Sequence, residues 1–482
     1  MRKIKYIMVL MVVLISCSDN ITDLNEDIIN PKTTKPEYLF TKAEKDLVDQ
    51  MVHPGIYNNV FRLFAQQFSE TSWILESQYN ISFGKIPDVH FGILYSNVLG
   101  NLKQSSNLLE NEKPISASEI AVLNNKKAVL DIIIAYTFSQ LVDTFGNIPY
   151  SEALSIKSHP MPKYDSGQVI YKDLIDKLTK ASKAIKVSEP TFGQADLIYN
   201  GDALKWKKFA NSLKLRLALN MSDVDPVYAA EQAKSAIQEG VITSNSDNFS
   251  LNYLSLPPNA SPLFLLSTSS YKDYFIPSKI LVDKMNSLID PRRAEYFTVG
   301  PDGKNYEGGI YGEVNLFSNY SHINSSLFTP TFPGTLFDYS ETEFLLAEAA
   351  ARSFISDDPE THYSQAIKAS MKNWGVSDAD SEAYLLNPDV AYKTAKGTWK
   401  QKIGEQAWIA LYNRGFEAWT SYRRLDFPIL FPPSQTYNNL GTIPKRYSYP
   451  GIEETLNSKN VEEAIKAIGG NSMSVKVFWD KN

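Results

Sequence analysis

The feature that most constrains this chain is a helical repeat of apolar side chains along most of its length. The clearest example runs from Asp202 to Met221, where apolar residues recur every three or four positions and lysines lie between them. This spacing places an apolar stripe along one side of an α-helix. Asp202 suits the N-cap of that helix, because its carboxylate can accept hydrogen bonds from free backbone N–H groups. We therefore expect a mainly α fold, in which helices bury their stripes against one another.

Other segments show the same helical pattern. They lie at Thr41–Met51, Ile56–Glu76, Glu119–Val142, Gln168–Ile185, Pro226–Gln238, Phe344–Arg352, His362–Trp374 and Lys400–Arg424. Ser340 and Glu343 have the spacing of a capping box ahead of the Phe344 helix. Trp206, Trp408 and Trp419 fall on helical faces and are predicted to be core residues. Paired helices are typical of tetratricopeptide-like repeats, but no repeat signature is clear enough to establish them from the periodicity.

The middle of the chain breaks this pattern. Residues 242–334 are rich in Ser, Asn, Pro, Gly and Tyr, and clusters such as Leu256–Pro262 interrupt regular structure. The segment Phe332–Tyr339 has the character of a short strand that leads into a helix. We predict a single domain over residues 31–482, with a long irregular insertion at about 242–334.

The N-terminus has the pattern of a lipoprotein signal. Arg2, Lys3 and Lys5 precede an apolar run that ends at Ile15, and the small residue Ser16 is followed by Cys17, the only cysteine in the chain. The run is too short to span a membrane, which takes about 20 residues. We predict a signal peptide over residues 1–16, lipidation of Cys17, and an acidic lipidated tether over residues 17–30. An ordinary signal peptide with an incidental cysteine is the alternative.

Charge and motif content exclude several functions. The formal net charge is −6, which argues against nucleic-acid binding because that function needs a basic surface. No phosphate-binding loop, serine-hydrolase elbow or zinc-protease motif is present. Paired acidic residues such as Glu70 and Glu76 could form a glycosidase acid and base, but such pairs arise by chance in an acidic chain. We expect no catalytic residue, no metal and no cofactor.

The aromatic residues carry more information. The chain has 7 Trp, 27 Tyr and 24 Phe, and many of them stand among polar neighbours outside the helical stripes. Such rings can cover the C–H face of a sugar while neighbouring amides and carboxylates bind its hydroxyls. The same rings can also serve to pin irregular loops to the scaffold.

Several segments together resemble the SusD/RagB family of outer-membrane lipoproteins. They are Gln140–Leu154 (QLVDTFGNIPYSEAL), Trp206–Leu219, Tyr412–Arg424, Ile443–Glu453 (IPKRYSYPGIE), the opening Ile29–Thr34 and the lipoprotein signal. They span almost the whole mature chain in the expected order. Because members with different ligands share these motifs, we assign Asp143, Gly146, Pro149, Arg423, Arg424, Arg446 and Glu453 to the frame of the fold.

The resemblance implies a scaffold of tetratricopeptide-like helix pairs, with loops and the irregular insertion forming the ligand surface. It implies a lipid-anchored protein on the outer face of the outer membrane that captures oligosaccharides for a SusC-type TonB-dependent transporter and has no enzymatic activity. By region rather than by motif, the expected ligand-binding residues are Trp73, Tyr79, Tyr271, Tyr274 and Tyr311. The first alternative is a peptide- or protein-binding surface lipoprotein, and the second is a surface glycoside hydrolase.

Overall fold

The computed structural model describes residues 34–481, and its scaffold consists of long helices. The signal peptide, Cys17 and the tether predicted from the sequence lie outside these residues. Successive helices pack as neighbours, α6 with α7, α8 with α9, α13 with α14 and α16 with α17. The long helices are α2 (Pro36–Val52), α6 (Ala117–Phe145), α7 (Gly167–Ala184), α8 (Ala203–Asn220), α9 (Pro226–Glu239), α13 (Tyr339–Ala351), α14 (Pro359–Asn373), α16 (Trp399–Ala410) and α17 (Gly415–Leu425).

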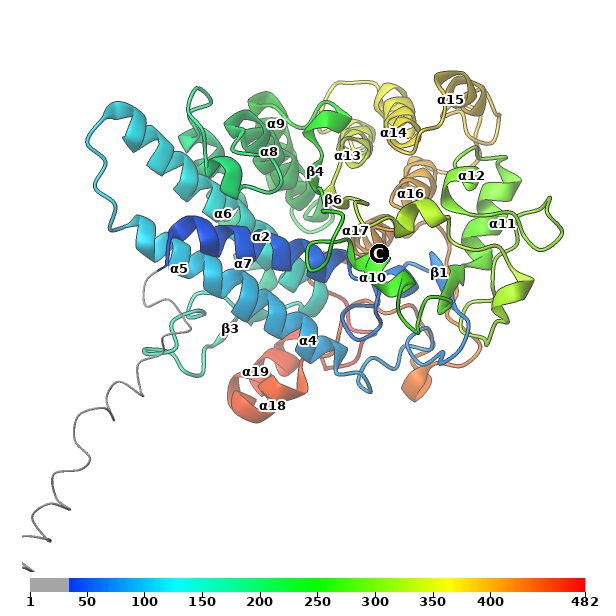
Figure 1. Cartoon of the computed structure of the whole chain (residues 1–482), viewed down its shortest axis with the longest axis horizontal. Coiled ribbons are helices and arrows are strands. Elements are labelled where there is room, and N and C mark those ends of the chain that lie inside the picture. The colour runs from blue at the N-terminus through cyan, green and yellow to red at the C-terminus, as the bar shows by residue number, and fades with distance from the viewer. Residues whose placement is uncertain (1–33, 482) are drawn as a thin grey trace, which may run out of the picture.

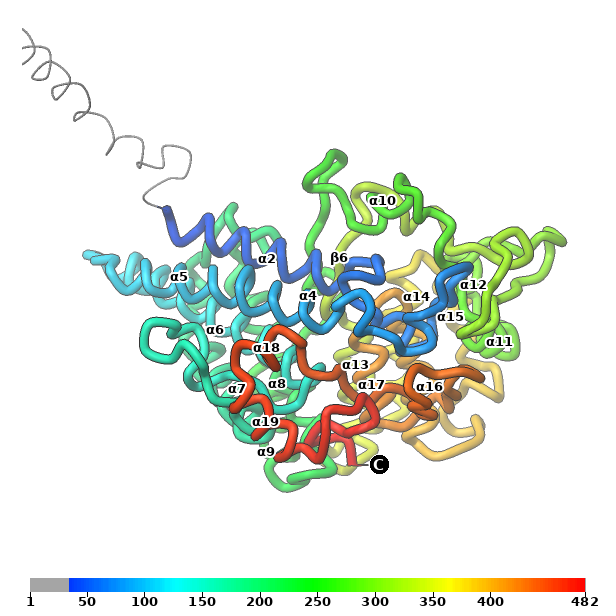
Figure 2. The backbone as a smooth tube through the Cα atoms, turned by 90° about the horizontal axis from the view of Figure 1, so that it is seen from below, coloured from blue at the N-terminus to red at the C-terminus, as the bar shows by residue number. Residues whose placement is uncertain are grey.

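Shorter helices complete the frame. Helices α5 to α7 lie at one end of the molecule and α11 and α12 at the other, in both views of the chain (Figures 1 and 2). The shorter helices are α3 (Phe61–Phe64), α4 (Ile86–Gly92), a π-helix (Ile93–Leu99), α5 (Gly100–Leu109), α10 (Pro262–Ser267), α11 (Lys279–Ser287), α12 (Arg293–Tyr296), α15 (Asp378–Leu385), α18 (Gly451–Leu456) and α19 (Ser458–Ile468). Single 3₁₀ turns lie at Gly193–Ala195, Asn245–Asp247, Phe317–Asn319, Ser325–Phe328 and Tyr437–Asn439.

Six short strands in the described chain form three antiparallel pairs. Each pair joins two segments that are separated in the sequence. The pairs are β1 (Phe68–Glu70) with β5 (Phe275–Pro277), β2 (Ile148–Pro149) with β3 (Tyr164–Asp165), and β4 (Phe249–Leu251) with β6 (Gly334–Phe337). Strand β6 confirms the strand expected ahead of α13. The irregular segment 242–334 therefore contains β4, β5 and the short helices α10 to α12 as well as loops.

The long amphipathic segments fold as the sequence predicts. Helix α8 begins at its predicted cap, where the Asp202 carboxylate accepts from the backbone N–H groups of Leu204 and Lys205. Trp206, Trp408 and Trp419 are buried as expected. Helix α6 is long and apolar enough to cross a membrane, but 89% of that stretch is buried inside the protein, which is the environment of a core helix.

The predicted helix Ile56–Glu76 is wrong. Only α3 is helical there, and the chain then enters β1 through Gln66, which has a φ of +51°. The Gln67 amide donates to the backbone carbonyls of Trp408 and Leu411 at 3.1 and 3.0 Å. The Gln67 side chain thus satisfies carbonyls at the end of α16, and this tertiary contact outweighs local helix propensity.

The predicted helix Lys400–Arg424 is divided into α16 and α17. Asn413 has a φ of +65°, and Gly415 starts α17 directly against α3. A Cβ atom on Gly415 would lie 2.3 Å from the backbone nitrogen of Arg62, so only glycine allows this approach. The start of α13 also differs from prediction, because Asp338 rather than Ser340 caps it by accepting from the Glu341 N–H.

The shared motif residues hold the frame together, as expected. Arg423 is fully buried and donates to the carbonyls of Asp143 and Lys445 at 2.8 and 2.7 Å. Arg446 donates to the carbonyl of Phe145 at 3.1 Å, and Gly146 ends α6 with a φ of +88°. These contacts satisfy carbonyls at the C-terminal end of α6, which have no partner within the helix.

Candidate functional site

The pairing of β1 with β5 creates the candidate site. Glu70 lies opposite Phe275 in the register, so the loop after β1 runs beside the segment before β5. Thr71 extends this pairing, because its backbone N–H donates to the Tyr274 carbonyl at 3.0 Å and its hydroxyl to the Asp273 carbonyl at 2.9 Å. Two regions far apart in the sequence are thereby brought together.

Three of the predicted binding residues meet at this junction. The Tyr274 hydroxyl donates to the Trp73 carbonyl at 2.7 Å, which ties the two loops together. The Trp73 side chain is 73% exposed and the Tyr271 side chain 49% exposed. The Tyr271 and Tyr274 rings lie edge to face, with centroids 6.1 Å apart. The site therefore offers exposed aromatic surface supported by a buried tyrosine.

An apolar cavity of about 270 Å³ opens at the same place. Tyr57, Leu265, Tyr271 and Tyr274 contribute to its wall, together with polar groups such as Asn58. Tyr57 is 50% exposed. It was not among the predicted binding residues, because it falls inside the helix predicted over Ile56–Glu76. The Pro54–Gly55 step just before it was the available signal that the chain turns there. We call Tyr57, Trp73, Tyr271 and Tyr274 the aromatic platform.

Tyr79 and Tyr311 do not reach the surface of the platform. Tyr79 is 0% exposed and packs edge to face on Phe64, with ring centroids 5.7 Å apart. Tyr311 is 7% exposed and its ring centroid lies 6.4 Å from that of Tyr79. Both rings are buried and neither lines the cavity, whereas Tyr274 lines it although its exposed fraction is only 6%. The structure therefore corrects the predicted role of Tyr79 and Tyr311 as ligand contacts. They are packing residues under the loop that carries Trp73.

Two buried carboxyls support the same loop. Glu70 accepts from the Ser77 N–H at 3.0 Å and also from the Ser77 hydroxyl, which closes the loop on itself. Burial raises the pKa of Glu70 to about 8, with the nearby Glu76 adding to the rise. Burial also raises the pKa of Glu76 to about 7. At neutral pH Glu70 therefore favours the protonated form and Glu76 is about half protonated, because a buried negative charge is costly.

Other chemistry is sparse in the described chain. Within residues 34–481, no group of three or more His, Cys, Asp or Glu side chains is arranged to hold a metal ion. Arginine–carboxylate pairs are numerous, but pairs such as Arg216 with Glu341 and Arg292 with Asp290 are buried between helices and belong to the scaffold.

Comparisons with known proteins agree with this architecture. Residues 29–450 match a SusD-like family described as starch-binding and associating with the outer membrane. A search among curated proteins finds no match.

Solved structures with the same fold cover nearly the whole chain. A chitin-binding protein superposes with a TM-score of 0.80 at 29% identity, covering 93% of this chain and 100% of its own. A SusD homologue from Bacteroides uniformis has a TM-score of 0.77 at 26% identity, covering 92% and 100%. A chitin-binding SusD homologue from Flavobacterium johnsoniae has a TM-score of 0.76 at 24% identity, covering 93% and 98%. The helix pairs, the shared frame motifs and the family match over most of the length agree, and the chain belongs to the SusD-like family, whose members associate with the outer membrane.

Proposed function

We propose that this protein is a cell-surface lipoprotein that captures oligosaccharides on the aromatic platform and delivers them to a SusC-type TonB-dependent transporter. Its action is binding without catalysis. The observation that carries the proposal is the exposed Trp73 ring on a loop that Tyr274 joins to an apolar cavity, whose wall includes Tyr57 and Tyr271.

The geometry of the platform suits a sugar chain. Exposed rings offer flat apolar faces for the C–H faces of pyranose rings, and the cavity between them accepts part of a ligand. Because Tyr274 and Glu70 fix the loops from below, the rings lose little freedom on binding. The chitin-binding protein of the same fold, at 29% identity, supports a glycan as the ligand class.

Lipidation at Cys17 would hold the platform at the membrane beside the transporter. A tethered binding protein raises the local concentration of ligand at its partner, so modest affinity for a single oligosaccharide is sufficient. Transporter delivery and the outward-facing anchor are parts of the proposal that rest on family membership and on the N-terminal sequence.

The glycosidase alternative finds little support at the platform. A pair of catalytic carboxyls flanks the substrate with about 5 to 9.5 Å between the two groups. Glu70 and Glu76 are instead 0% and 2% exposed, and they interact with each other beneath the loop. Peptide binding remains the second candidate, because exposed tyrosines and a small apolar cavity also suit a peptide side chain.

A glycan array tests the platform directly. We expect the mature protein to bind a defined set of oligosaccharides, and Trp73→Ala with Tyr271→Ala to abolish that binding without lowering the melting temperature. Tyr38→Ala is the matched control, since Tyr38 is 64% exposed on α2, outside the platform. A peptide array and an assay for released reducing sugar run in parallel. Binding only to peptides, or sugar release, contradicts the proposal.

Purification from native membranes tests the partner. We expect the lipidated protein, solubilised in mild detergent, to co-purify with an outer-membrane transporter. The Trp73→Ala variant should retain this partner, because the change affects ligand and not anchorage. Recovery of the protein without any transporter argues against delivery. Glycan capture is then decided separately by the glycan array.

A further inference from the structure

A second cavity, of about 430 Å³, lies apart from the platform. It is bounded by the β4–β6 sheet, by the C-terminal ends of α14 and α16, and by the start of α17. We call it the asparagine pocket because five asparagines line it, namely Asn245, Asn248, Asn252, Asn373 and Asn413. Its volume falls in the range of small-molecule sites, about 300–1,000 Å³.

Helix α10 separates the pocket from the platform. Leu263 on this helix lines the asparagine pocket, while Leu265 and Leu266 line the cavity of the platform. The two cavities therefore have different walls and can be altered independently.

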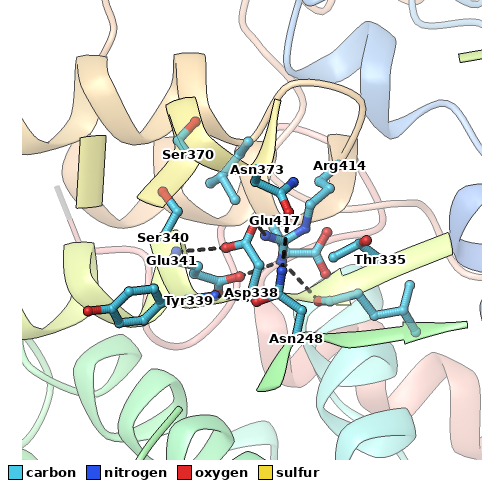
Figure 3. Close-up of polar contacts among 12 residues, drawn as sticks. Asn248, Thr335, Asp338, Tyr339, Ser340, Glu341, Ser370, Asn373, Arg414 and Glu417 are labelled. Carbon is cyan, nitrogen blue, oxygen red and sulfur yellow. Dashed lines mark hydrogen bonds and ion pairs between the residues drawn. The ribbon is translucent and has the colours of Figure 1, made fainter. Parts of the chain in front are cut away.

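The strand pair gives the pocket its polar floor. Side chains alternate between the two faces of a strand, and Phe249 and Leu251 of β4 point into the core. Ser250 lies between them and faces the pocket with Thr335 of β6, and their hydroxyl oxygens are 2.6 Å apart. Asn248 and Asn373 approach from two other segments and join through an amide contact of 3.4 Å (Figure 3).

Two buried polar atoms at this pocket have no hydrogen-bond partner in the described chain. Arg414 is 8% exposed and lines the pocket, with one guanidinium nitrogen donating to the Leu336 carbonyl at 3.0 Å and another 3.0 Å from the Asp338 carboxylate. Its Nε atom has no partner, and neither has Oδ1 of Asn245. Both atoms are enclosed by neighbouring groups, so the amides that a ligand in the pocket can reach are those of the exposed Asn373 and Asn252.

The charge balance around the pocket favours a neutral ligand. The guanidinium of Arg414 is already paired with Asp338 and Glu341, and Figure 3 shows these groups together beside Asn248. The ammonium of Lys205 at the rim donates to the Ser246 carbonyl at 2.7 Å. The charge of Arg414 is thus balanced by carboxylates within the protein, so an anionic ligand would gain little from it.

An aromatic wall completes the site. Trp374 and Phe332 both line the pocket, are partly exposed, and have ring centroids 6.3 Å apart. Apolar ring surface on one side and amide and hydroxyl groups on the other match the two kinds of surface that a sugar presents.

We propose that the asparagine pocket is a second saccharide site, separate from the platform, that takes a neutral monosaccharide or disaccharide. Asn373 and Asn252 bind the hydroxyls, and Trp374 covers the C–H face. The inference shares with the proposed function only the class of ligand, because the pocket has its own walls and its own unsatisfied groups.

The test measures the pocket with the platform disabled. Glucose, N-acetylglucosamine, maltose, cellobiose, xylobiose and chitobiose are titrated into the Trp73→Ala/Tyr271→Ala protein by calorimetry and saturation-transfer NMR, with trialanine as the peptide probe. Asn373→Ala removes one amide at an exposed position, and Asn252→Trp fills the cavity from its exposed rim. Asn107→Ala, on the exposed face of α5, is the matched control. Melting temperatures confirm that each variant is folded.

We expect at least one sugar to bind the platform-disabled protein, with affinity reduced about tenfold by Asn373→Ala, as for loss of one hydrogen bond. Asn252→Trp should abolish that binding and Asn107→Ala should leave it unchanged. The proposal is overturned if no sugar binds, if both pocket variants bind like the control, or if trialanine binds in place of the sugars. Failure of the platform is a separate result, seen when Trp73→Ala/Tyr271→Ala leaves the glycan-array signal of the intact protein unchanged.

Discussion

Trp73 and Tyr79 belong to the same loop, yet their side chains have opposite environments. Trp73 is 73% exposed, while Tyr79 is 0% exposed and packs on Phe64. Both residues have positive φ values, 56° and 70°, so neither continues a regular helix or strand. Their exposure differs because the loop folds back on β1, where the Ser77 N–H donates to the Glu70 carboxyl. Ligand binding and loop support therefore fall to different aromatic residues within one short segment.

Truncation of these two aromatics should have contrasting effects. Trp73→Ala is expected to weaken oligosaccharide binding about tenfold or more, as for an aromatic anchor at a binding site, with no change in melting temperature. Tyr79→Ala is expected to lower the free energy of unfolding by about 3–5 kcal/mol, because it leaves a cavity in the core. Calorimetric titration and urea unfolding of both variants check this. Equal losses of stability in both would contradict the assignment of Trp73 to the surface.

Glu70 makes stability depend on pH. Its pKa is about 8 in the folded protein against an ordinary value of 4.5, so between these values the folded state holds a proton that the unfolded state has lost. Stability from this group is fully present below pH 4.5 and falls as the pH rises toward 8, by up to about 1.4 kcal/mol per pH unit.

Glu70→Gln resembles the protonated carboxyl and does not titrate. We expect its melting temperature to fall less steeply than that of the unaltered protein between pH 5 and pH 8. Glu76→Gln should flatten part of the same window, up to its pKa of about 7. Glu112→Gln, at an exposed position, is the control and should follow the unaltered protein. Parallel curves for Glu70→Gln and the unaltered protein would refute a protonated Glu70.

Among the elements, the β1–β5 pair brings together the two loops that carry Trp73 and Tyr271. It contains only three residues in each strand, and it determines that the loop with Trp73 lies beside the loop with Tyr271. The long helices provide the rigid body on which this pair rests, since Gln67 next to β1 is hydrogen-bonded to the end of α16. The shared arginines act at the same level, because Arg423 and Arg446 join the end of α6 to the C-terminal segment.

Helix α8 offers a direct test of local helix energetics. Asp202→Ala removes the side chain that accepts from Leu204 and Lys205, and we expect a loss of about 0.5–2 kcal/mol in the free energy of unfolding. Asp202→Asn should retain most of the stability, because asparagine is also a good N-cap. Urea unfolding measures both. An alanine variant as stable as the asparagine variant would show that the cap is dispensable.

The whole molecule combines a frame of packed helices with loops that carry the proposed platform. The frame includes α6, the longest helix of the described chain. Its length and apolar composition would suit a membrane span, but it lies in the core of the protein. Attachment to the membrane through Cys17, which lies outside the described residues, is part of the proposed function. On this arrangement, the binding surfaces and the anchor are separate parts of the protein.

Anchoring should depend on one residue. Cys17→Ala is expected to release the protein from the membrane fraction, because a signal of this type attaches lipid to the cysteine sulfur. The released protein should keep its glycan affinity, since the platform does not involve the N-terminus. Cell fractionation and calorimetric titration of the same variant check both parts. Retention of Cys17→Ala in the membrane fraction would contradict lipid anchoring at this residue.

The sequence by itself determined the class of fold and most of the frame. Apolar periodicity predicted the long helices, because a helix of this kind buries one stripe wherever it packs. Family resemblance correctly assigned Arg423 and Arg446 to the scaffold. The predicted binding role of Trp73, Tyr271 and Tyr274 stays a prediction, and the structure adds that the three residues lie together.

Only the tertiary structure decided which aromatics face solvent and how the site is built. Tyr79 and Tyr311 look like Trp73 and Tyr271 in the sequence, but packing beneath the loop buries them. The break of Ile56–Glu76 at Gln66 and the start of α17 at Gly415 depend on contacts with distant segments. The asparagine pocket likewise unites residues from β4, α14 and α17 that share no sequence pattern. The local sequence pattern indicates whether a residue of this type tends to be buried. Its actual exposure and its partners are determined by the distant segments that fold against it.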